Sequence, residues 1–254
     1  MSPDPAIGRP GTAGSASLGR MTDEPKTVAF LLYPGFTVLD LVGPLQVFSS
    51  LAAFDPGYRV VVVGARIERW DTDTPLRITA SHTFDQVPAP AVLVVPGGGV
   101  PTAKAAVDPE LIGYVRSVAE KAEVMASVCT GSMILGAAGL LKGREATSHW
   151  SFVDLLSEFG ATPVSRRWVE DGPVLTAAGV AAGIDMALHL VERFAGAEVA
   201  KQIQFGIEYD PEPPQGALDW EQAPRELWAG FREHMLREGL ADSPELRDRL
   251  LHQS

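Results

Sequence analysis

Apolar and polar positions along the chain follow two alternating patterns. Short, unbroken apolar runs are typical of strands buried on both faces of a sheet, and they occupy residues 27–33, 58–64, 91–95 and 123–128. Segments with apolar residues at helical spacing lie between and after these runs, and they predict helices over residues 39–54, 108–121, 130–141, 151–159, 184–194 and 197–204. Shorter strands are expected within 66–79 and at 146–148, 162–169 and 174–177.

The regular alternation of strand and helix, with short links between them, predicts a mostly parallel sheet with helices on both faces. Ligands of such sheets bind beyond the carboxyl ends of the strands. Three segments that could carry chemistry follow predicted strands, namely those around Asp40, around Gly97 and Gly98, and around Cys129. We therefore expect them to meet at one edge of the sheet.

The two ends of the chain differ from this central α/β domain, which we assign to residues 25–206. Residues 1–24 are rich in Pro, Gly, Ser and Thr and lack the apolar segment of a secretory signal, so we expect a disordered leader. Residues 207–254 begin as a proline-rich extended arm and continue into a helix over 225–240. On that helix an apolar stripe is expected to pack on the domain or on a second subunit rather than to line a ligand groove. The stripe consists of Trp228, Phe231, Met235 and Leu236.

Composition narrows the class of protein. The 254 residues include 46% apolar residues and suit one globular domain. A net charge of −11 disfavours nucleic acid as a partner, and no apolar segment is long enough to predict a membrane span. The single cysteine, Cys129, excludes an intrachain disulfide and fits a reducing compartment, so the cytoplasm is the expected location.

Cys129 lies between a predicted strand and a predicted helix, the arrangement of a nucleophile elbow. The free N–H groups and the positive dipole end of the following helix would then point at the sulfur. Such a position lowers a thiol pKa, so the sequence favours a reactive thiolate. The alternative is that Cys129 is a small buried apolar residue.

Three further positions carry alternatives. Pro96-Gly97-Gly98-Gly99 is either a plain turn or a source of backbone donors, in which the N–H groups of Gly98 and Thr130 would stabilise charge on an adduct. Asp40 is either a helix N-cap or an acid that moves protons at the thiol. His149 is either the base of a Cys–His dyad or a hydrogen-bonded structural residue.

The remaining candidates point away from a metal centre. His82, His189, His234 and His252 show no metal-ligand spacing, so no metal site is expected. Asp185, in the first turn of a predicted helix, is interpreted as structural.

Several segments together resemble the class I glutamine amidotransferase-like superfamily that includes the PfpI proteases, over about residues 27–204. They read FLLYPGFTVLDLVGPLQVF, VVPGGG, ASVCTGSMILGAAGLL, ATSHW and LTAAGVAAGIDMALHLVE. The branches most similar are the isonitrile hydratases and the ligand domain of AraC-type regulators. IEYDPEPPQGA at 207–217 resembles the extension of the hydratases and favours that branch.

The resemblance implies a flavodoxin-like, three-layer α/β sandwich, a homodimer and a strained cysteine elbow. It implies Cys129 as nucleophile, Asp40 as general acid–base, Thr130 as a group that places water or substrate, and Gly98 beside the site, with Gly97 and His149 as supporting residues. Three departures are informative. The proteases have His directly after the cysteine, where this chain has Thr130, and the glyoxalase-like branch has Glu in place of Asp40. The downstream His–Glu pair of the amidotransferases is not found.

The predicted activity is hydration of a small-molecule isonitrile to an N-substituted formamide through a cysteine thioimidate, with neither metal nor organic cofactor. Two alternatives remain open. One is a small-molecule or oxidation sensor related to the regulator ligand domain, although the tail is too short for a helix-turn-helix domain. The other is a superfamily enzyme that acts on reactive carbonyls.

Overall fold

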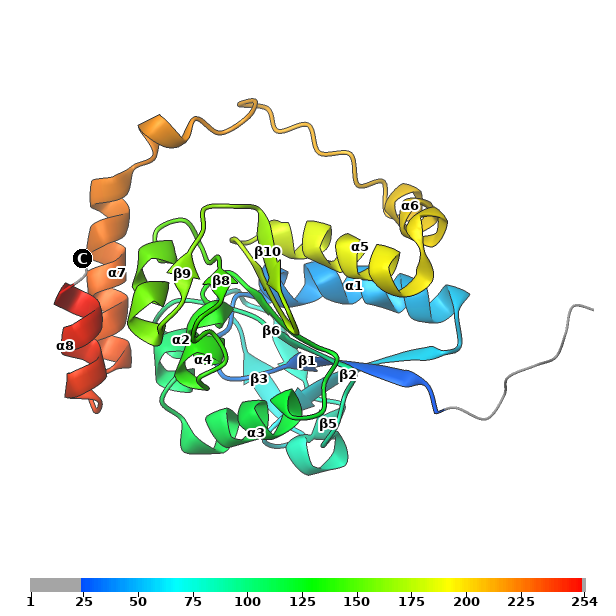
Figure 1. The fold of residues 1–254 in the computed structure, drawn as a ribbon, viewed down its shortest axis with the longest axis horizontal. Helices are drawn as coiled ribbons and strands as arrows, with labels where there is room; N and C mark the ends of the chain where they lie inside the picture. The colour runs from blue at the N-terminus through cyan, green and yellow to red at the C-terminus, as the bar shows by residue number, and fades with distance from the viewer. Residues whose placement is uncertain (1–23, 253–254) are drawn as a thin grey trace, which may run out of the picture.

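A seven-stranded sheet forms the centre of the molecule, and the computed structural model describes residues 24–252 (Figure 1). The predicted leader, apart from Glu24, lies outside the described residues. The strand order is β10-β11-β7-β6-β1-β2-β5, and only the β10–β11 pair is antiparallel. The strands are β1 (Lys26–Leu31), β2 (Tyr58–Gly64), β5 (His82–Thr83), β6 (Val92–Val95), β7 (Val124–Val128), β10 (Trp168–Asp171) and β11 (Val174–Ala177).

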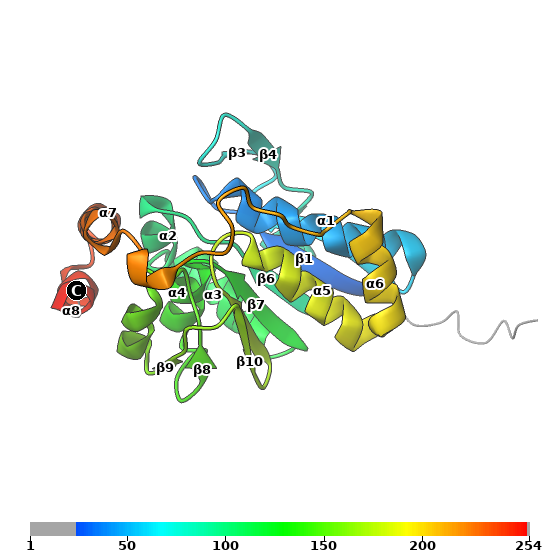
Figure 2. The same ribbon diagram turned by 90° about the horizontal axis from the view of Figure 1, so that it is seen from above.

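Helices cover both faces of the sheet, as predicted (Figures 1 and 2). On one face α1 (Val38–Phe54) packs against α5 (Ala182–Ala195), which in turn contacts α6 (Ala197–Gly206). On the other face lie α3 (Pro109–Ala119) and α4 (Gly131–Ala137). The four apolar runs form β1, β2, β6 and β7, and every residue of β6 and β7 is buried because both of their faces are covered. The predicted three-layer α/β sandwich is confirmed.

Several element boundaries differ from the prediction for local reasons. Residues 162–169 form two strands instead of one, β9 (Thr162–Pro163) and β10, and β9 pairs with β8 (Glu145–Ala146) in a separate small sheet. Pro163 has no N–H to donate, which restricts further pairing. The helix predicted over 130–141 ends at Ala137, because Gly139 adopts a left-handed conformation with φ of 85°. The helix predicted over 151–159 is a 3₁₀ helix, η2 (Val153–Phe159).

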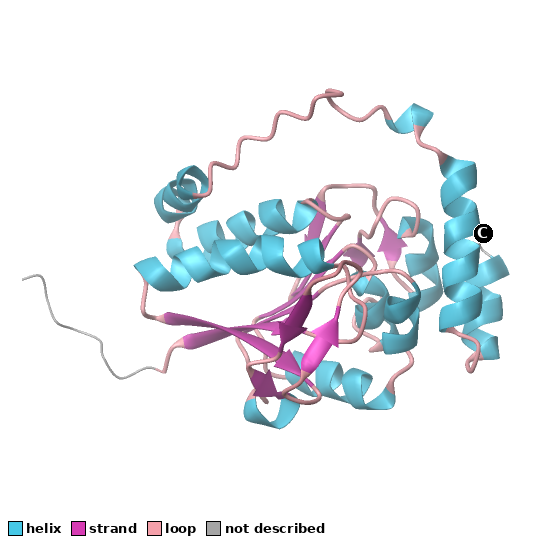
Figure 3. Cartoon of the chain, turned by 180° about the vertical axis from the view of Figure 1, so that it is seen from behind, coloured by secondary structure: helices cyan, strands magenta, loops and turns pink. Residues whose placement is uncertain are grey.

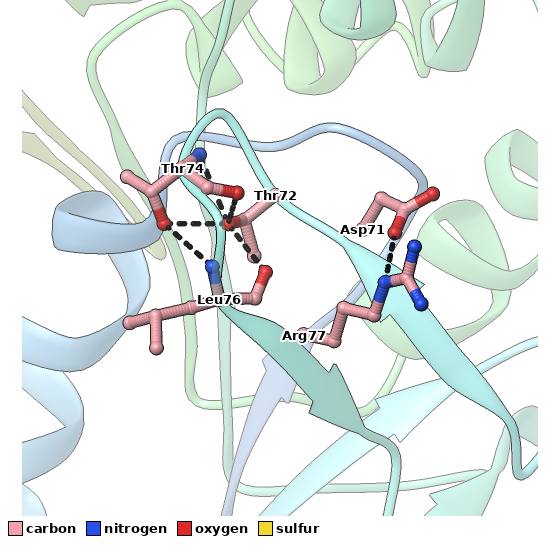
Figure 4. Close-up of polar contacts among 5 residues, drawn as sticks. All are labelled: Asp71, Thr72, Thr74, Leu76 and Arg77. Atoms are coloured by element: carbon pink, nitrogen blue, oxygen red, sulfur yellow. Dashed lines mark hydrogen bonds and ion pairs between the residues drawn. The ribbon is translucent and has the colours of Figure 1, made fainter.

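A small hairpin is attached to the loop that follows β1. Its strands are β3 (Arg69–Asp71) and β4 (Arg77–Thr79), and η1 (Phe84–Gln86) follows β5. Thr72 Oγ1 and Thr74 Oγ1 lie 2.9 Å apart and organise the turn, while the Arg77 guanidinium pairs with Asp71 at 2.8 Å (Figure 4). The Gly35 N–H donates to the Asp71 carbonyl at 2.8 Å. The hairpin therefore holds the loop that leads into α1.

Two helices were not predicted from the sequence. The first, α2 (Val100–Ala105), begins directly after the glycine run, and the second, α8 (Pro244–His252), follows the terminal helix α7 (Arg225–Gly239). The proline-rich arm passes over the α1–α5 face and contains only the short η3 (Trp220–Gln222) before α7 (Figure 3). Tyr209 anchors the start of this arm, because its hydroxyl lies 3.1 Å from Asp185 Oδ2.

The second half of the apolar stripe on α7 packs on the body. Met235 and Leu236 are fully buried in a second apolar cluster with residues of α2, α4, η2 and the residue before η2, namely Ala103, Met133, Leu155 and Phe152, together with Leu240 and Leu250. Trp228 and Phe231 lie outside that cluster. Among residues 24–252, no helix combines the length and the apolar character that crossing a bilayer requires.

Candidate functional site

Cys129 occupies a strained corner between β7 and α4. Its φ of 57° lies in the left-handed region, which is costly for a residue with a side chain, by about 1–2 kcal/mol. Hydrogen bonds hold it there: its N–H donates to the Ala177 carbonyl at 3.1 Å, and its carbonyl accepts from Ser148 Oγ at 3.1 Å and Ser132 Oγ at 3.2 Å. Strain that the surroundings maintain in this way is typical of functional sites. The geometry is that of the predicted elbow.

Two glycines allow the loop after β6 to touch the elbow. A side-chain methyl at Gly131 would lie 2.3 Å from the Val95 carbonyl oxygen, and one at Gly97 would lie 2.6 Å from the Thr130 nitrogen. Both contacts are with backbone, which cannot move aside easily. The glycine run is therefore more than a plain turn, because it brings the backbone of residues 96–98 against the start of α4.

Asp40 projects from the first turn of α1 and is completely buried. Its Oδ2 accepts a hydrogen bond from the Gly97 N–H at 2.9 Å, whereas Oδ1 has no hydrogen bond of ordinary length. The Asp40 carboxyl and the Cys129 thiol interact, since each changes the pKa of the other. The N-cap of α1 is Thr37, so the alternative interpretation of Asp40 as an N-cap is wrong.

Burial controls the protonation of this pair. It raises the pKa of Asp40 from 3.8 to about 8, against the lowering effect of the Gly97 hydrogen bond, and the charge of Asp73 raises it further. Burial and the neighbouring Asp40 raise the pKa of Cys129 well above its ordinary value, although the backbone N–H of Thr130 lowers it. The expectation of a thiolate at neutral pH is thus corrected, because desolvation outweighs the short helix α4. The resting pair is a thiol beside a carboxylic acid.

Thr130 and Gly98 are joined by two hydrogen bonds. The Thr130 hydroxyl accepts from the Gly98 N–H at 2.9 Å and donates to the Gly98 carbonyl at 2.7 Å. The Gly98 N–H is therefore occupied, which disfavours its predicted part as a donor to an adduct. Gly98 fixes Thr130 instead, and the Thr130 backbone N–H is the donor directed at the Cys129 sulfur.

His149 lies close to the thiol but is not prepared as a base. Its Nδ1 is 2.8 Å from Ser151 Oγ, and burial lowers its pKa to about 4, so the ring is neutral at pH 7. The ring packs against Gly179, where an added methyl would lie 2.4 Å from His149 Cδ2 and 3.3 Å from Cys129 Sγ. This geometry favours the structural interpretation over a Cys–His dyad.

Two residues of the site were not found from the sequence. Tyr33, at the end of the first apolar run, is buried and donates to the Pro96 carbonyl at 2.8 Å, while its oxygen lies 2.9 Å from Thr102 Oγ1. These two hydrogen bonds connect the end of β1 to both ends of the glycine run. Gly179, which adjoins the sulfur, is one of several glycines in its segment and carries no distinguishing pattern. Neither has a local signal, because both contacts join elements far apart in the chain.

The other candidates lie apart from Cys129. Asp185 forms an ion pair with Arg167 at 2.6 Å and accepts from Tyr209, which is the structural part predicted for it. A hollow of about 420 Å³ adjoins this group, and another of about 360 Å³ lies between η1 and α3. Over residues 24–252, no group of three or more His, Cys, Asp or Glu residues is arranged to hold a metal ion.

The segments that build this site also match known proteins in sequence. The DJ-1/PfpI family model matches residues 26–193, which run from β1 into α5 and include Asp40, Gly97, Cys129, Thr130 and His149. Isonitrile hydratase of Pseudomonas putida is 42% identical over 188 residues, which cover 74% of this chain and 80% of that protein.

Two further relatives are a solved structure that also covers most of the C-terminal region and a transcriptional regulator. A crystal structure of a ThiJ/PfpI family protein from Pseudomonas syringae is 36% identical with a TM-score of 0.77, and covers 92% of this chain and 98% of its own. The HTH-type transcriptional regulator CdhR of Pseudomonas aeruginosa is 30% identical over 177 residues, 68% of this chain but only 52% of the regulator.

Proposed function

Because this chain belongs to the DJ-1/PfpI family, we propose that it is an isonitrile hydratase, which adds water to an isonitrile and releases an N-substituted formamide. The observation that carries the proposal is the buried pair of Asp40 and Cys129, in which burial raises the pKa of the carboxyl to about 8. The similarity to isonitrile hydratase of Pseudomonas putida supports the same activity. The substrate is a small molecule, and the chain's own groups supply the nucleophile and the acid.

The first step forms a carbon–sulfur bond. Loss of one proton leaves a single proton for the pair to share, and in the reactive form this proton is on Asp40. The Cys129 thiolate then donates its electron pair to the terminal carbon of R–N≡C. The lone pair on that carbon takes the proton of the Asp40 carboxylic acid. The products are the thioimidate R–N=CH–S–Cys129 and an Asp40 carboxylate. An acid with an ordinary carboxyl pKa would be ionised at pH 7 and could not deliver this proton.

The second step consumes water and restores the pair. The Asp40 carboxylate takes a proton from water as the water oxygen bonds to the thioimidate carbon, and it passes that proton to the nitrogen. The carbon–sulfur bond then breaks, the thiolate leaves, and the hydroxyl proton returns to Asp40. The backbone N–H of Thr130 stabilises negative charge on the leaving sulfur. The released product is R–NH–CHO.

The direct assay is hydration of cyclohexyl isonitrile by purified protein, followed by the appearance of N-cyclohexylformamide. We expect turnover by the wild type, none by Cys129→Ala and a loss of at least about 100-fold in Asp40→Asn, because general acid–base catalysis contributes roughly that much. Asp242→Asn, which changes an exposed carboxyl, is the matched control and should retain full activity. Undiminished turnover by Cys129→Ala would refute the proposal.

The two alternatives give different outcomes in the same preparation. A sensor related to CdhR-like regulators would show no turnover but would gain thermal stability with a bound small molecule. An enzyme of reactive carbonyls would convert methylglyoxal to lactate. Oxidation sensing is disfavoured because burial raises the pKa of Cys129 and so reduces the thiolate that oxidants attack.

A further inference from the structure

Six rings form a connected group that approaches Cys129 through His149, and we name them the aromatic cluster. They are His149, Trp150, Phe152, Trp220, Trp228 and Phe231. The centroid of Trp228 lies 4.7 Å from that of His149, 5.7 Å from that of Trp150 and 5.3 Å from that of Phe231. Three of the rings come from the segment before η2, one comes from η3 in the arm and two come from α7, so the C-terminal region completes the cluster.

The aromatic cluster touches both loops that build the site. His149 packs on Gly179, and a single methyl group placed at Gly179 would contact both the His149 ring and the Cys129 sulfur. On the other side, Phe231 Cζ would lie 3.3 Å from a methyl at Gly99, next to the residue that fixes Thr130. The cluster therefore adjoins the reacting sulfur through one ring and the glycine run through another.

The position of α7 is held by contacts that do not involve Trp228 or Phe231. Met235 and Leu236, one to two turns further along the helix, are fully buried. The Arg232 guanidinium donates to the Ser151 carbonyl at 3.1 Å and pairs with Asp154 at 3.0 Å (Figure 1 shows α7 beside the body). Trp228 and Phe231 are thus presented at a defined place relative to Cys129.

The aromatic cluster is only partly covered. Trp220, which contacts Trp150, is 52% exposed, and Phe231, which contacts Trp228, is 42% exposed. Exposed aromatic surface that continues into a site is suited to receive an apolar group. Continuity with Cys129 indicates that this partner is the part of the substrate that does not react.

We propose that the aromatic cluster binds the substituent of the isonitrile and selects aryl isonitriles over small alkyl ones. This inference rests on the proposed hydratase activity and specifies its substrate class. A flat aryl group would stack on the exposed rings in the offset or edge-to-face arrangements that such rings prefer, while its isonitrile carbon reaches Sγ. Methyl isonitrile carries no ring that could stack in this way.

The test compares kcat/KM for phenyl isonitrile and methyl isonitrile in the wild type and in Trp228→Leu, which keeps an apolar side chain and so preserves the packing of α7. We expect a loss of about tenfold or more for phenyl isonitrile and less than about twofold for methyl isonitrile. Leu227→Ala, at a 73% exposed position on the same helix, is the control and should match the wild type. Equal losses for both substrates, or no loss for either, would overturn the inference.

A binding measurement separates this inference from the proposed reaction. The affinity of N-phenylformamide is measured by calorimetry in Cys129→Ala and in the double variant with Trp228→Leu. If no isonitrile is hydrated but binding weakens about tenfold with Trp228→Leu, the hydratase proposal fails and the aromatic cluster keeps its role. If isonitriles are hydrated but Trp228→Leu changes neither the affinity for N-phenylformamide nor kcat/KM, the proposed role of the aromatic cluster is wrong and the hydratase proposal is retained. Absence of both turnover and binding contradicts both.

Discussion

At the residue scale, the exceptional feature is a carboxyl group placed where its charge is not favoured. Asp40 is buried beside a thiol, and its single ordinary hydrogen bond comes from the Gly97 N–H. Burial therefore keeps the carboxyl protonated at neutral pH. A buried carboxyl of this kind lowers the stability of the folded protein, as groups at active sites often do.

Replacement of Asp40 by Asn should stabilise the fold while it lowers activity by at least about 100-fold. The folded-state pKa of about 8 lies above the ordinary 3.8, so the wild type loses stability as pH rises from about 4 to about 8. Asn keeps an acceptor for the Gly97 N–H but never ionises. We expect its free energy of unfolding, measured in urea, to exceed that of the wild type by about 5 kcal/mol at pH 8, and to match it near pH 4. Asp40→Asn being the less stable protein at pH 8 would contradict this.

The pH dependence of catalysis follows from the same two groups. The reactive form has one proton less than the resting pair, and both pKa values are raised, so kcat/KM should increase as pH rises toward about 8. The increase should approach about tenfold per pH unit between about pH 6 and 7, and a decline should follow only when the second proton is lost. An isonitrile carries no titratable proton here, so the profile reports the protein. A rate that falls between pH 6 and 8 would exclude the assignment.

The position of Cys129 could be predicted from sequence, whereas its protonation could not. A strand-to-helix corner is a local pattern, so an apolar run followed by a helical segment was enough to locate it. The pKa depends on what surrounds the sulfur. Asp40 is supplied by α1 and Gly97 by the loop after β6. A local sequence pattern cannot reveal how far these distant segments exclude water from the sulfur.

At the scale of elements, the site depends on three loops that meet at the carboxyl ends of β1, β6 and β7. These strands are adjacent in the sheet, so the loops that follow them converge. This convergence was predictable, because short, unbroken apolar runs indicate buried parallel strands. The helix α2 was missed because it starts directly after a glycine run, and the strand predicted over 162–169 was too long because Pro163 interrupts it.

Gly97→Ala should disable the site by forcing these loops apart. The new methyl would lie 2.6 Å from the Thr130 nitrogen and 2.8 Å from the Gly131 nitrogen, both of which are backbone atoms. We expect destabilisation of about 1–3 kcal/mol, from overpacking, together with loss of most formamide production. Gly113→Ala is the matched control, since no atom lies within 4 Å of its added methyl and it should retain both stability and activity. Wild-type activity in Gly97→Ala would show that the close approach is dispensable.

At the scale of the whole molecule, the arm and α7 link the tail to the site. The extended arm and a terminal helix were predicted from prolines and from an apolar stripe, but the place where the helix docks was not. Docking is decided by a second apolar cluster whose members are far apart in sequence, such as Ala103, Met133 and Leu250. Met235 and Leu236 pack in this cluster, and Trp228 packs against His149 and Trp150, while a part for Trp228 in ligand binding is our proposal.

The family resemblance predicts a homodimer, and the surface of this chain is compatible with a partner. Large apolar side chains remain exposed on the arm and near it, including Phe205 at 72% and Leu218 at 72%. Sedimentation equilibrium should give twice the chain mass of 27.1 kDa. Phe205→Ser should shift the mass toward the monomer if this face is the interface, with Leu76→Ser, at a 60% exposed position on the hairpin, as control. A single species of 27.1 kDa in the wild type would contradict the prediction.

The central claim is that Cys129 becomes covalently bonded to the isonitrile carbon during turnover. Rapid-quench mass spectrometry of the protein with cyclohexyl isonitrile tests it directly. The account predicts a transient increase by the mass of one isonitrile, located on the peptide that contains Cys129, which decays as the formamide appears. Formamide that accumulates with no adduct at any time, or with the adduct on another residue, would contradict it.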